Sequence, residues 1–264
     1  MSENDYMFNS SEHDSELTRL RKIEELYDPA THEWLLRTGL TQGWCCLEVG
    51  AGCGSIANWL SQQVGANGRV VAVDMNTRFL GWLDAENLTV LEGKIGEVSL
   101  DSNYFDLIHG RYVLIHNADN EELLKRLYGL LKPGGWLVLE EPDFSVAKFD
   151  QGTAQQEAAF NAVCKAIEAA FQQTDMDYAF GSRLEELFKK LGFCDISSET
   201  EKTVDRGDTE MSAMMRRSTV QLRDKYISTG HVESEDIDNY VKLTLDPQSS
   251  ACYYATVRCV GRKD

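Results

Sequence analysis

The sequence predicts an α/β fold built on a doubly wound, mostly parallel sheet. A buried strand over 45–50 runs directly into a glycine-rich turn and a helix, and a second buried strand follows over 69–74. Helix and strand patterns then alternate as far as residue 141. Alternation of this kind needs right-handed crossovers between parallel strands. With 264 residues the chain can bury the full core of such a sheet.

Composition excludes several kinds of protein. Hydrophobic residues make up 42% of the chain, and no apolar run reaches the roughly 20 residues that a membrane span needs. The formal charge of −17, from 43 acidic and 26 basic residues, predicts a surface that repels phosphate backbones, so no nucleic-acid partner is expected. The polar, acidic start of the chain lacks the basic segment and apolar core of a secretion signal, which predicts a cytoplasmic protein.

The seven cysteines form no Cys-x-x-Cys pair, and most lie in apolar patterns, which predicts buried, reduced thiols. Cys45, Cys46 and Cys53 are close enough in sequence to suggest a metal or a thiol-reactive substrate. Strand alternation, however, points the first two in opposite directions. A structural role is favoured, and no metal is expected.

The predicted elements begin with an N-terminal cap. Apolar residues at near-helical spacing predict helices over 12–28 and 31–40. The segment from Lys132 to Gly135 ends the last core helix, because proline removes a donor and glycine permits unusual torsions. The core elements are strand 45–50, helix 54–64, strand 69–74, helix 76–85, strand 88–92, strand 105–109, helix 119–131 and strand 135–141.

The C-terminal part adds helices and two further strands. Apolar spacing from Phe160 to Phe171 predicts an inserted helix, and Ser182 with Glu185 predicts a capping box for another, which ends at Gly192. The region 208–244 is expected above the carboxyl edge of the sheet. The remaining predicted elements are strand 193–200, helix 208–228, helix 233–244 and a final strand over 251–260.

The first glycine-rich turn predicts a cofactor site of the nucleotide type. Gly50, Gly52 and Gly54 allow a ligand to approach the backbone closely, and the amides at the following helix start favour electronegative groups. Asp74 ends the second strand, where a carboxylate can hold a ribose diol through two charge-assisted hydrogen bonds. A nicotinamide dinucleotide is the competing ligand. Its fingerprint needs Gly-x-Gly-x-x-Gly, whereas Ser55 stands here at the third glycine position.

Four motifs in this order resemble those of class I S-adenosylmethionine-dependent methyltransferases, over residues 45–142. They are Leu47-Glu-Val-Gly-Ala-Gly-Cys-Gly54, Val71-Ala-Val-Asp-Met75, Phe105-Asp-Leu-Ile-His109 and Leu130-Leu-Lys-Pro-Gly-Gly-Trp-Leu-Val-Leu139. Within that superfamily the chain looks like the group that methylates small molecules, including quinone precursors and natural products. The resemblance implies a Rossmann-like, seven-stranded sheet in the order 3-2-1-4-5-7-6, with the last strand antiparallel.

The resemblance also implies one methyltransferase domain over 1–264, with a helical cap at 1–44, a cofactor-binding core at 45–142, and substrate-side helical inserts with the remaining sheet at 143–264. It assigns S-adenosylmethionine as cofactor and S-adenosylhomocysteine as product. The residues implied to bind the cofactor are Glu48 near the methionine amino group; Gly50, Ala51 and Gly52 under the methionine and ribose; Asp74 at the ribose hydroxyls; Met75 on the adenine; and Gly110 and Arg111 at the methionine end.

One position departs from the family's pattern. The family often places an aspartate after the glycine that corresponds to Gly93, where it binds the adenine amine, but this chain has Lys94. The backbone of Ile95 or the side chain of Glu97 is left to make that contact.

Methyl transfer from a sulfonium is an in-line displacement, so the protein mainly aligns the nucleophile and excludes water, and a catalytic residue is dispensable. A phenol or enol acceptor would benefit from a base, and the candidates are His116, Glu141 and Asp143. The alternatives are a structural hydrogen bond for His116 and a solvated acidic turn for the carboxylates. His109 lies within a strand, which favours a core imidazole. Arg111 and Tyr112 are candidates for orienting an acceptor.

Apolar residues of the cap and inserts could line a hydrophobic substrate pocket or belong to the ordinary core: Tyr6, Phe8, Phe144, Phe149, Tyr178, Met211, Met214 and Met215. The resulting hypothesis is methyl transfer to a small, apolar or aromatic molecule. The alternative is a binding protein or enzyme of the same fold that does not transfer the methyl group. A protein or tRNA acceptor is disfavoured by the acidic balance. The sequence does not indicate the acceptor atom or the oligomeric state.

Overall fold

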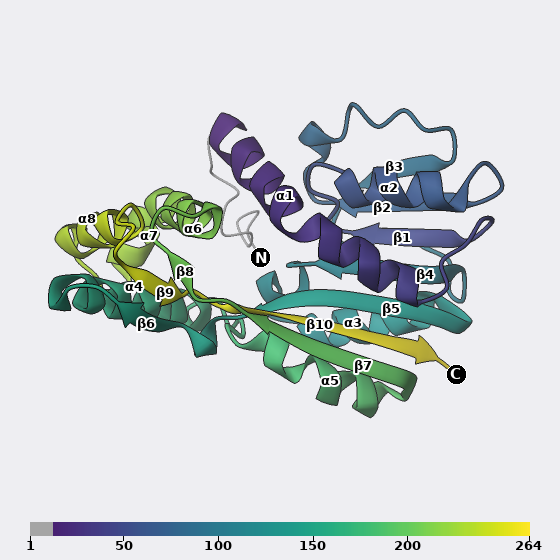
Figure 1. Ribbon diagram of the computed structural model, residues 1–264. Coiled ribbons are helices and arrows are strands. Elements are labelled where there is room, and N and C mark those ends of the chain that lie inside the picture. The colour runs from purple at the N-terminus through teal and green to yellow at the C-terminus, as the bar shows by residue number, and fades with distance from the viewer. Residues whose placement is uncertain (1–12) are drawn as a thin grey trace.

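The computed structural model describes residues 13–264, and its main sheet has the predicted strand order (Figure 1). Seven strands follow one another as β3-β2-β1-β4-β5-β10-β7, and the first five are parallel to one another. Strand β10 runs antiparallel to both β5 and β7. The prediction of a Rossmann-like sheet is confirmed. The strands are β1 (Cys45–Val49), β2 (Arg69–Asp74), β3 (Leu88–Glu92), β4 (Phe105–Arg111), β5 (Leu131–Asp143), β7 (Phe193–Lys202) and β10 (Ala255–Lys263).

Helices cover both faces of this sheet. Helix α1 (His13–Arg37) and helix α2 (Ser55–Val64) pack on one face, where Leu35, Leu60 and Cys46 are completely buried. Helix α3 (Asn120–Leu130) and helix α5 (Phe180–Leu191) cover the other face. Two separate apolar layers therefore enclose the sheet, as a doubly wound fold requires.

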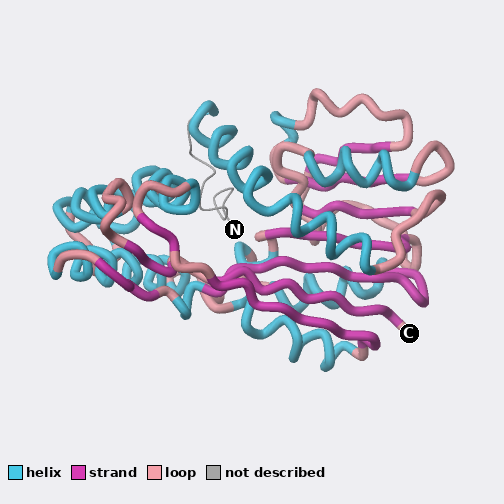
Figure 2. The backbone as a smooth tube through the Cα atoms, viewed as in Figure 1, coloured by secondary structure: helices cyan, strands magenta, loops and turns pink. Residues whose placement is uncertain are grey.

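The remaining elements form a cover beside the carboxyl ends of the parallel strands (Figures 1 and 2). It contains a small three-stranded sheet in the order β6-β9-β8, which the sequence did not predict. The elements of the cover are β6 (Lys148–Gln151), α4 (Ala154–Gln172), β8 (Asp205–Arg206), α6 (Glu210–Gln221), α7 (Arg223–Ser228), α8 (Ser234–Leu243) and β9 (Ser250–Cys252).

The predicted final strand over 251–260 is wrong in one respect, because the chain changes sheets within it. Strand β9 pairs with β6 and β8, and β10 then pairs with β5 and β7. Tyr253 and Tyr254 lie between the two strands and are both buried. The hydroxyl of Tyr254 lies 2.6 Å from that of Tyr27 on α1, so a long-range contact fixes the bend.

The N-terminal cap is one helix rather than the two predicted over 12–28 and 31–40. Pro29 lies inside α1, although proline normally breaks or kinks a helix by removing a backbone bond. Tyr27 and Thr31, on either side of it, are buried against the sheet, as are Trp34 and Leu35 one turn later. The free energy gained by burying this face outweighs the cost of a proline inside the helix. The sequence pattern of the helix alone does not reveal that burial.

The helix predicted over 76–85 is absent. Only one 3-10 turn, Thr77–Phe79, forms there, because the Asn76 side chain accepts a hydrogen bond from the Arg78 amide and starts a tight turn. The indole of Trp82 then donates to the carbonyl of Cys53 at 2.8 Å, which ties the loop to the glycine-rich turn. The predicted capping box of Ser182 is also wrong, since α5 begins at Phe180 and the Ser182 hydroxyl donates to Ala179.

Two findings concern the chain as a whole. Within residues 13–264, no helix is at once long and apolar enough to cross a membrane. All seven cysteines are free thiols, and burial raises the pKa of Cys53 to about 12. Burial also raises the pKa of Cys46, whereas Cys45 is half-buried.

Two glycine variants test the packing of α5 on the sheet. A Cβ at Gly181 would lie 2.6 Å from the carbonyl oxygen of Glu141, whereas one at Gly129 in α3 would meet nothing within 4 Å. Gly181→Ala should therefore destabilise the protein by about 2 kcal/mol or more, and Gly129→Ala should stabilise it by about 0.5–1 kcal/mol. Urea unfolding measures both. Equal effects of the two variants would contradict the packing described here.

Candidate cofactor and substrate cavity

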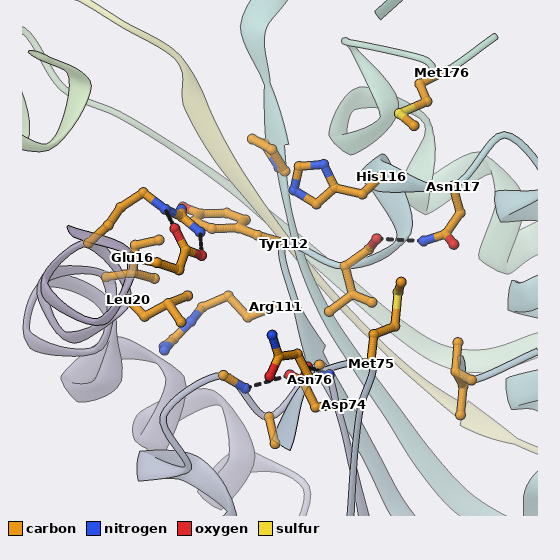
Figure 3. Close-up of a pocket in the computed structure, with 18 of the residues that line it drawn as sticks. Glu16, Leu20, Asp74, Met75, Asn76, Arg111, Tyr112, His116, Asn117 and Met176 are labelled. Atoms are coloured by element: carbon orange, nitrogen blue, oxygen red, sulfur yellow. Dashed lines mark hydrogen bonds and ion pairs between the residues drawn. The ribbon is translucent and has the colours of Figure 1, made fainter. Parts of the chain in front are cut away.

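A cavity of about 1400 Å³ lies at the carboxyl ends of β1, β2 and β4, between the sheet, the first half of α1 and the cover (Figure 3). Asp74 and Met176 lie toward opposite ends of it in the figure, with Tyr112 and His116 between them. Ligand pockets of proteins usually enclose about 300–1000 Å³. This volume is large enough for two ligands side by side.

The glycine-rich turn forms the floor of one end. The amides of Gly50 and Ala51 donate to the carbonyl of Val73 at 2.8 and 3.2 Å, so the turn continues the pairing of β1 with β2. Gly50 has a φ of 68° and Gly52 a φ of 57°, in the left-handed region that side chains disfavour. The Gly52 amide donates to the carboxylate of Asp74 at 2.8 Å. Gly50, Ala51 and Gly52 were predicted to form the turn. They line the cavity together with Val73 and Asp74.

Asp74 is held by the backbone on both sides. One carboxylate oxygen accepts from the Gly52 amide and the other from the Asn76 amide, at 2.8 and 2.9 Å. Burial raises the pKa of this carboxyl, and the two amides oppose the rise by stabilising the charged form. Each carboxylate oxygen can accept a second hydrogen bond. The carboxylate is therefore fixed in direction and can still accept from two hydroxyl groups.

The start of α2 is not open to a ligand in the way that the sequence suggests. The Ser55 amide donates to the carboxylate of Glu24 at 3.0 Å, and the Gly54 amide donates to the carbonyl of Ala51. Glu24 belongs to α1, which thus caps α2 across the cavity. Burial raises the pKa of the Glu24 carboxyl.

Glu48 and His109 begin a buried chain of charged groups behind the turn. Glu48 lines the cavity, and its Oε2 lies 2.7 Å from Nδ1 of His109. The other ring nitrogen of His109 lies 3.2 Å from the Glu140 carboxylate, which accepts a 2.7 Å bond from Arg258. The expectation of a hydrogen-bonded core imidazole at His109 is confirmed. The two flanking carboxylates were not predicted, because they lie on other strands.

Arg111 lines the cavity and is fixed by α1. Its guanidinium donates to Asp28 and to the hydroxyl of Thr31, both at 2.8 Å. Gly110 lies one residue earlier, inside the sheet between Val49 and Leu139, and is not among the residues that line the cavity. Of the two positions expected at the methionine end, only Arg111 thus faces the cavity.

The adenine end of the predicted site is built from two loops. Met75, which is 45% exposed, lines the cavity after β2. Lys94 and Ile95 line it after β3, together with Glu97. Ile95 is buried and its carbonyl accepts from Arg126 at 2.8 Å, so this loop is tied to α3.

Three candidate catalytic residues occupy different environments. His116 lines the cavity at the end of a 3-10 turn, Leu114–His116, and burial together with the charges of Arg19 and Lys225 lowers its pKa to about 4. The imidazole is therefore neutral at physiological pH. Glu141 and Asp143 are buried and do not line the cavity.

The two carboxylates hold the backbone instead. Glu141 accepts from the amides of Val113, Leu114 and Ile115 at 2.8 to 3.3 Å, and so fixes the turn that carries His116. Asp143 accepts from the amide and the hydroxyl of Ser145 at 2.9 and 2.6 Å. The sequence indicated acids at the strand exit but not which way they point.

The protonation of Glu141 gives a stability prediction. Burial raises its pKa to about 8, so between about pH 4.5 and 8 the folded state binds a proton that the unfolded state has released. This contribution makes the free energy of unfolding fall as the pH rises through that range. Glu141→Gln should remove this fall and retain activity, because its amide oxygen still accepts from the turn. Urea unfolding at pH 5, 6.5 and 8 measures it, with exposed Glu199→Gln as the control.

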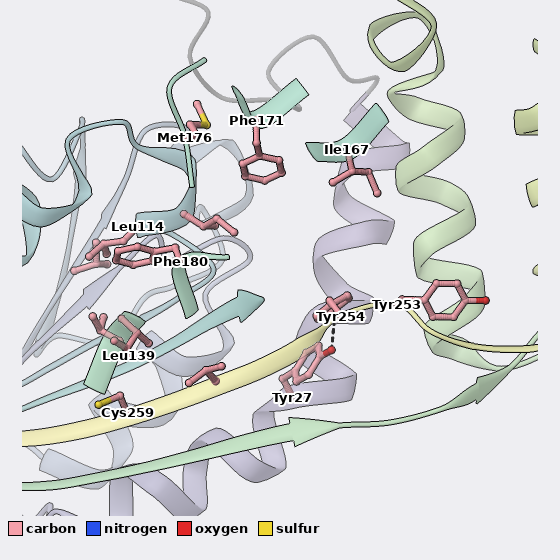
Figure 4. Close-up of a cluster of buried hydrophobic side chains, with 14 of the residues drawn as sticks. Tyr27, Leu114, Leu139, Ile167, Phe171, Met176, Phe180, Tyr253, Tyr254 and Cys259 are labelled. Carbon is pink, nitrogen blue, oxygen red and sulfur yellow. Dashed lines mark hydrogen bonds between the residues drawn. The ribbon is translucent and has the colours of Figure 1, made fainter. Parts of the chain in front are cut away.

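The end of the cavity away from Asp74 is lined mainly by apolar side chains, with the polar residues Gln173, Thr174, Asp175, Ser218 and Thr219 among them. It is lined by side chains of the cover: Phe144, Ile167, Phe171, Met176, Met214, Met215, Tyr226 and Tyr254. Phe144, Met214 and Met215 were predicted; Phe149, Tyr178 and Met211 do not line this cavity, and Tyr6 and Phe8 lie outside the described residues. Figure 4 shows Ile167, Phe171, Met176 and Tyr254 within the apolar cluster behind this end.

Sequence reasoning missed one part of the cavity, the residues of α1 that line it. The first half of α1 lines it with Leu20 and Ile23 and with the ion pair of Glu16 and Arg19, which is buried and has a 2.7 Å contact. Tyr112, which the sequence offered as a candidate for orienting an acceptor, also lines the cavity; its φ of 57° is unusual for a side chain of that size, and its hydroxyl lies 2.5 Å from that of Thr256. The periodicity of α1 predicted that one face of the helix is buried, but not what that face contacts.

Comparisons with known proteins agree with this geometry. A family model described as a methyltransferase domain matches residues 19–198. Methyltransferase str2 of Strobilurus tenacellus is 36% identical over 107 residues, which cover 38% of this chain and 36% of that protein. The demethylmenaquinone methyltransferase of Lactococcus lactis subsp. lactis is 26% identical over 174 residues, 60% of this chain and 68% of that protein.

Among solved structures, phosphoethanolamine N-methyltransferase 2 of Haemonchus contortus is similar, with a TM-score of 0.60 and 18% identity. The match covers 97% of this chain and 59% of that one, which was solved with phosphomonomethylethanolamine and S-adenosylhomocysteine. At this identity the likeness shows a shared fold.

The chain spans 33% to 45% of the length of the first three curated relatives it matches. The family model nevertheless covers more than half of the chain and includes all four motifs around the cavity. S-adenosylmethionine is the cofactor of that family. The chain therefore belongs to the class I S-adenosylmethionine-dependent methyltransferase family.

Proposed function

We propose that this protein transfers a methyl group from S-adenosylmethionine to a small, apolar or aromatic molecule. The observation that carries the proposal is the single cavity in which the Asp74 turn and the apolar side chains of the cover face the same space. A cofactor at one end and an acceptor at the other would lie in contact within it.

The residues at the first end fit the proposed cofactor. Asp74 offers two oriented carboxylate oxygens for the ribose hydroxyls. A Cβ at Gly52 would meet nothing nearer than 3.8 Å, so the backbone there has free space above it. Glu48 and Arg111 carry opposite charges and both line the cavity, which suits the ammonium and carboxylate of a methionine end.

The residues at the second end support an apolar acceptor. Ile167, Phe171 and Met176 come from α4 and the loop after it, and Met214 and Met215 come from α6. Methionine side chains adapt to ligands of irregular shape. The name of one similar enzyme, demethylmenaquinone methyltransferase, describes a quinone acceptor, whereas the name of methyltransferase str2 describes none. The acceptor of this protein is therefore proposed by class alone.

The residues of this chain would act by position. S-adenosylmethionine, when bound, supplies an electrophilic methyl group on a sulfonium, so its leaving group is already in place. The cover and α1 exclude water and hold the acceptor in line with the methyl group. His116 is neutral and lines the cavity between its two ends, so it can accept a hydrogen bond from the acceptor and orient it.

Replacing His116 should therefore lower the rate more than it lowers binding. His116→Ala is expected to reduce kcat by up to about tenfold, because one neutral hydrogen bond contributes about 0.5–1.5 kcal/mol, and to leave the affinity for S-adenosylmethionine unchanged. Single-turnover assays and calorimetry separate these quantities. His231→Ala, in an exposed loop, is the matched control. Unchanged turnover in His116→Ala would exclude the imidazole from the reaction.

Transfer of a radiolabelled methyl group to a metabolite extract tests the proposed function. We expect labelled products that partition into organic solvent, and no label on any protein or RNA band. Label on protein or RNA would favour a macromolecular acceptor. Tight binding of S-adenosylmethionine with no labelled product across extracts of differing origin would favour the alternative, a protein of this fold that binds the cofactor without transferring its methyl group.

A further inference from the structure

His109 lies behind the cavity wall and is fully enclosed by the protein. Its side chain is completely buried, and both ring nitrogens face carboxylates, Glu48 at 2.7 Å and Glu140 at 3.2 Å. Three neighbouring strands, β1, β4 and β5, thus each contribute one charged side chain to a row of contacts across the sheet. Glu48 is the register partner of His109, and Glu140 lies two residues beyond its other register partner, Val138. Only the Glu48 end of this row reaches the cavity.

The charges of the groups around the imidazole nearly cancel. Four carboxylates and three cations, counting His109, form the connected set, so one negative charge is in excess. His32 stays neutral, since burial lowers its pKa. The charged and titratable neighbours are Asp28 and His32 from α1, Glu48 from β1, Arg111 from β4, Glu140 from β5, Glu201 from β7 and Arg258 from β10.

The Glu48 carboxylate has one engaged and one open oxygen. Oε2 is bonded to His109, whereas among residues 13–264 no hydrogen bond to Oε1 is formed. Glu48 is only 3% exposed, and the surface that it retains lies on the cavity wall. A buried carboxylate with one open oxygen toward a cavity is a site for a cation.

We propose that His109 is a positioning residue, which keeps the Glu48 carboxylate ionised and directed at the ammonium group of the cofactor's amino-acid end. This inference rests on the proposed function, because it concerns how that cofactor is held. Burial disfavours the imidazolium, but the Glu48 charge and the hydrogen bonds with both carboxylates raise the pKa of His109 to about 9. Without the imidazolium, burial would favour protonated Glu48, since it already raises the pKa of that carboxyl.

Two ligands test the proposal by calorimetry: S-adenosylmethionine, and 5′-methylthioadenosine, which has the nucleoside and the sulfur but no amino-acid end. His109→Gln should weaken S-adenosylmethionine by about tenfold, the size of one charge-assisted hydrogen bond, and leave methylthioadenosine unchanged. His231→Gln, in an exposed loop, is the control for the substitution itself. Equal losses for both ligands in a folded His109→Gln would overturn the proposal.

A double-mutant cycle tests whether His109 acts through Glu48. We expect Glu48→Gln to weaken S-adenosylmethionine and the Glu48→Gln, His109→Gln pair to weaken it no further. Additive losses would show that His109 acts by another route. A structural role alone would lower the thermal midpoint without this dependence on the second residue.

The pH profile of wild-type binding gives a further test. The affinity for S-adenosylmethionine relative to methylthioadenosine should fall above about pH 9, as His109 loses its proton. The amino group of S-adenosylmethionine loses its own proton as the pH rises, whatever protein binds it. The folded His109→Gln protein measures how much of the change in affinity comes from the ligand. A wild-type ratio that is constant from pH 7 to 10 would overturn the proposal. Failure of the wild type to bind either ligand would instead contradict the proposed function.

Discussion

Asp74→Ala is expected to weaken the binding of S-adenosylmethionine by at least about a hundredfold. The carboxylate is held by two backbone amides and can accept two hydroxyl hydrogens, and each hydrogen bond to a charged group contributes about 1.5–3 kcal/mol. Alanine removes both. The nucleoside part of the ligand is affected directly, so methylthioadenosine should lose affinity to a similar degree.

Calorimetry measures this loss, and an exposed acid provides the matched control. Asp101 lies in the loop before β4 and does not line the cavity, so Asp101→Ala should bind both ligands as the wild type does. Asp74→Asn keeps one acceptor oxygen and should have an intermediate effect. Unaltered affinity in a folded Asp74→Ala protein would show that the ribose lies elsewhere.

Glu140→Gln is expected to destabilise the protein by about 3–5 kcal/mol, which is the usual effect of removing one partner of a buried ion pair. Glu140 is completely buried between His109 and Arg258 and also accepts from Thr31. Its ionised neighbours hold the pKa of this carboxyl at about 2 despite its burial. The neutral amide would leave His109 with Glu48 alone, and Arg258 with the half-exposed Glu201 alone, as counter-charges.

Urea unfolding measures this effect, with Glu199→Gln as the control. Glu199 lies on the neighbouring strand β7, opposite Arg258 in register, but its side chain is exposed. We expect a change below about 0.5 kcal/mol there. In the wild type, the stability from Glu140 is present above about pH 4.5 and is lost on acidification toward pH 2. A Glu140→Gln protein as stable as the wild type would show that the buried charges do not depend on this carboxylate.

The cofactor end of the cavity could be predicted from sequence because its requirements are local. Gly50 and Gly52 need positive φ, and Asp74 follows a strand that pairs directly with the one before the turn. Each requirement involves residues fewer than thirty positions apart. The absence of the helix after β2 was not predictable in this way, since Asn76 and Trp82 stabilise the loop through contacts that helical periodicity does not register.

The candidate bases show most clearly what could not be predicted from the sequence. Sequence places His116, Glu141 and Asp143 near the strand ends, and the structure puts only His116 on the cavity wall. Glu141 is turned toward three backbone amides, because a strand exit leaves donors that must be satisfied once buried. Which polar group meets such a need depends on the path of a segment almost thirty residues away.

The amino-acid sequence by itself determined the alternation of strands and helices, the glycine-rich turn and the acid that faces it, because backbone torsion and strand alternation act over short stretches of chain. The order of the strands was implied by the resemblance to a family. Only the tertiary structure decided that α1 continues through Pro29, that the chain changes sheets at Tyr253 and Tyr254, and that Glu48, His109 and Glu140 form one row. These features come from burial and charge pairing between residues that are far apart in sequence. Their free energy exists only when the elements are already packed together.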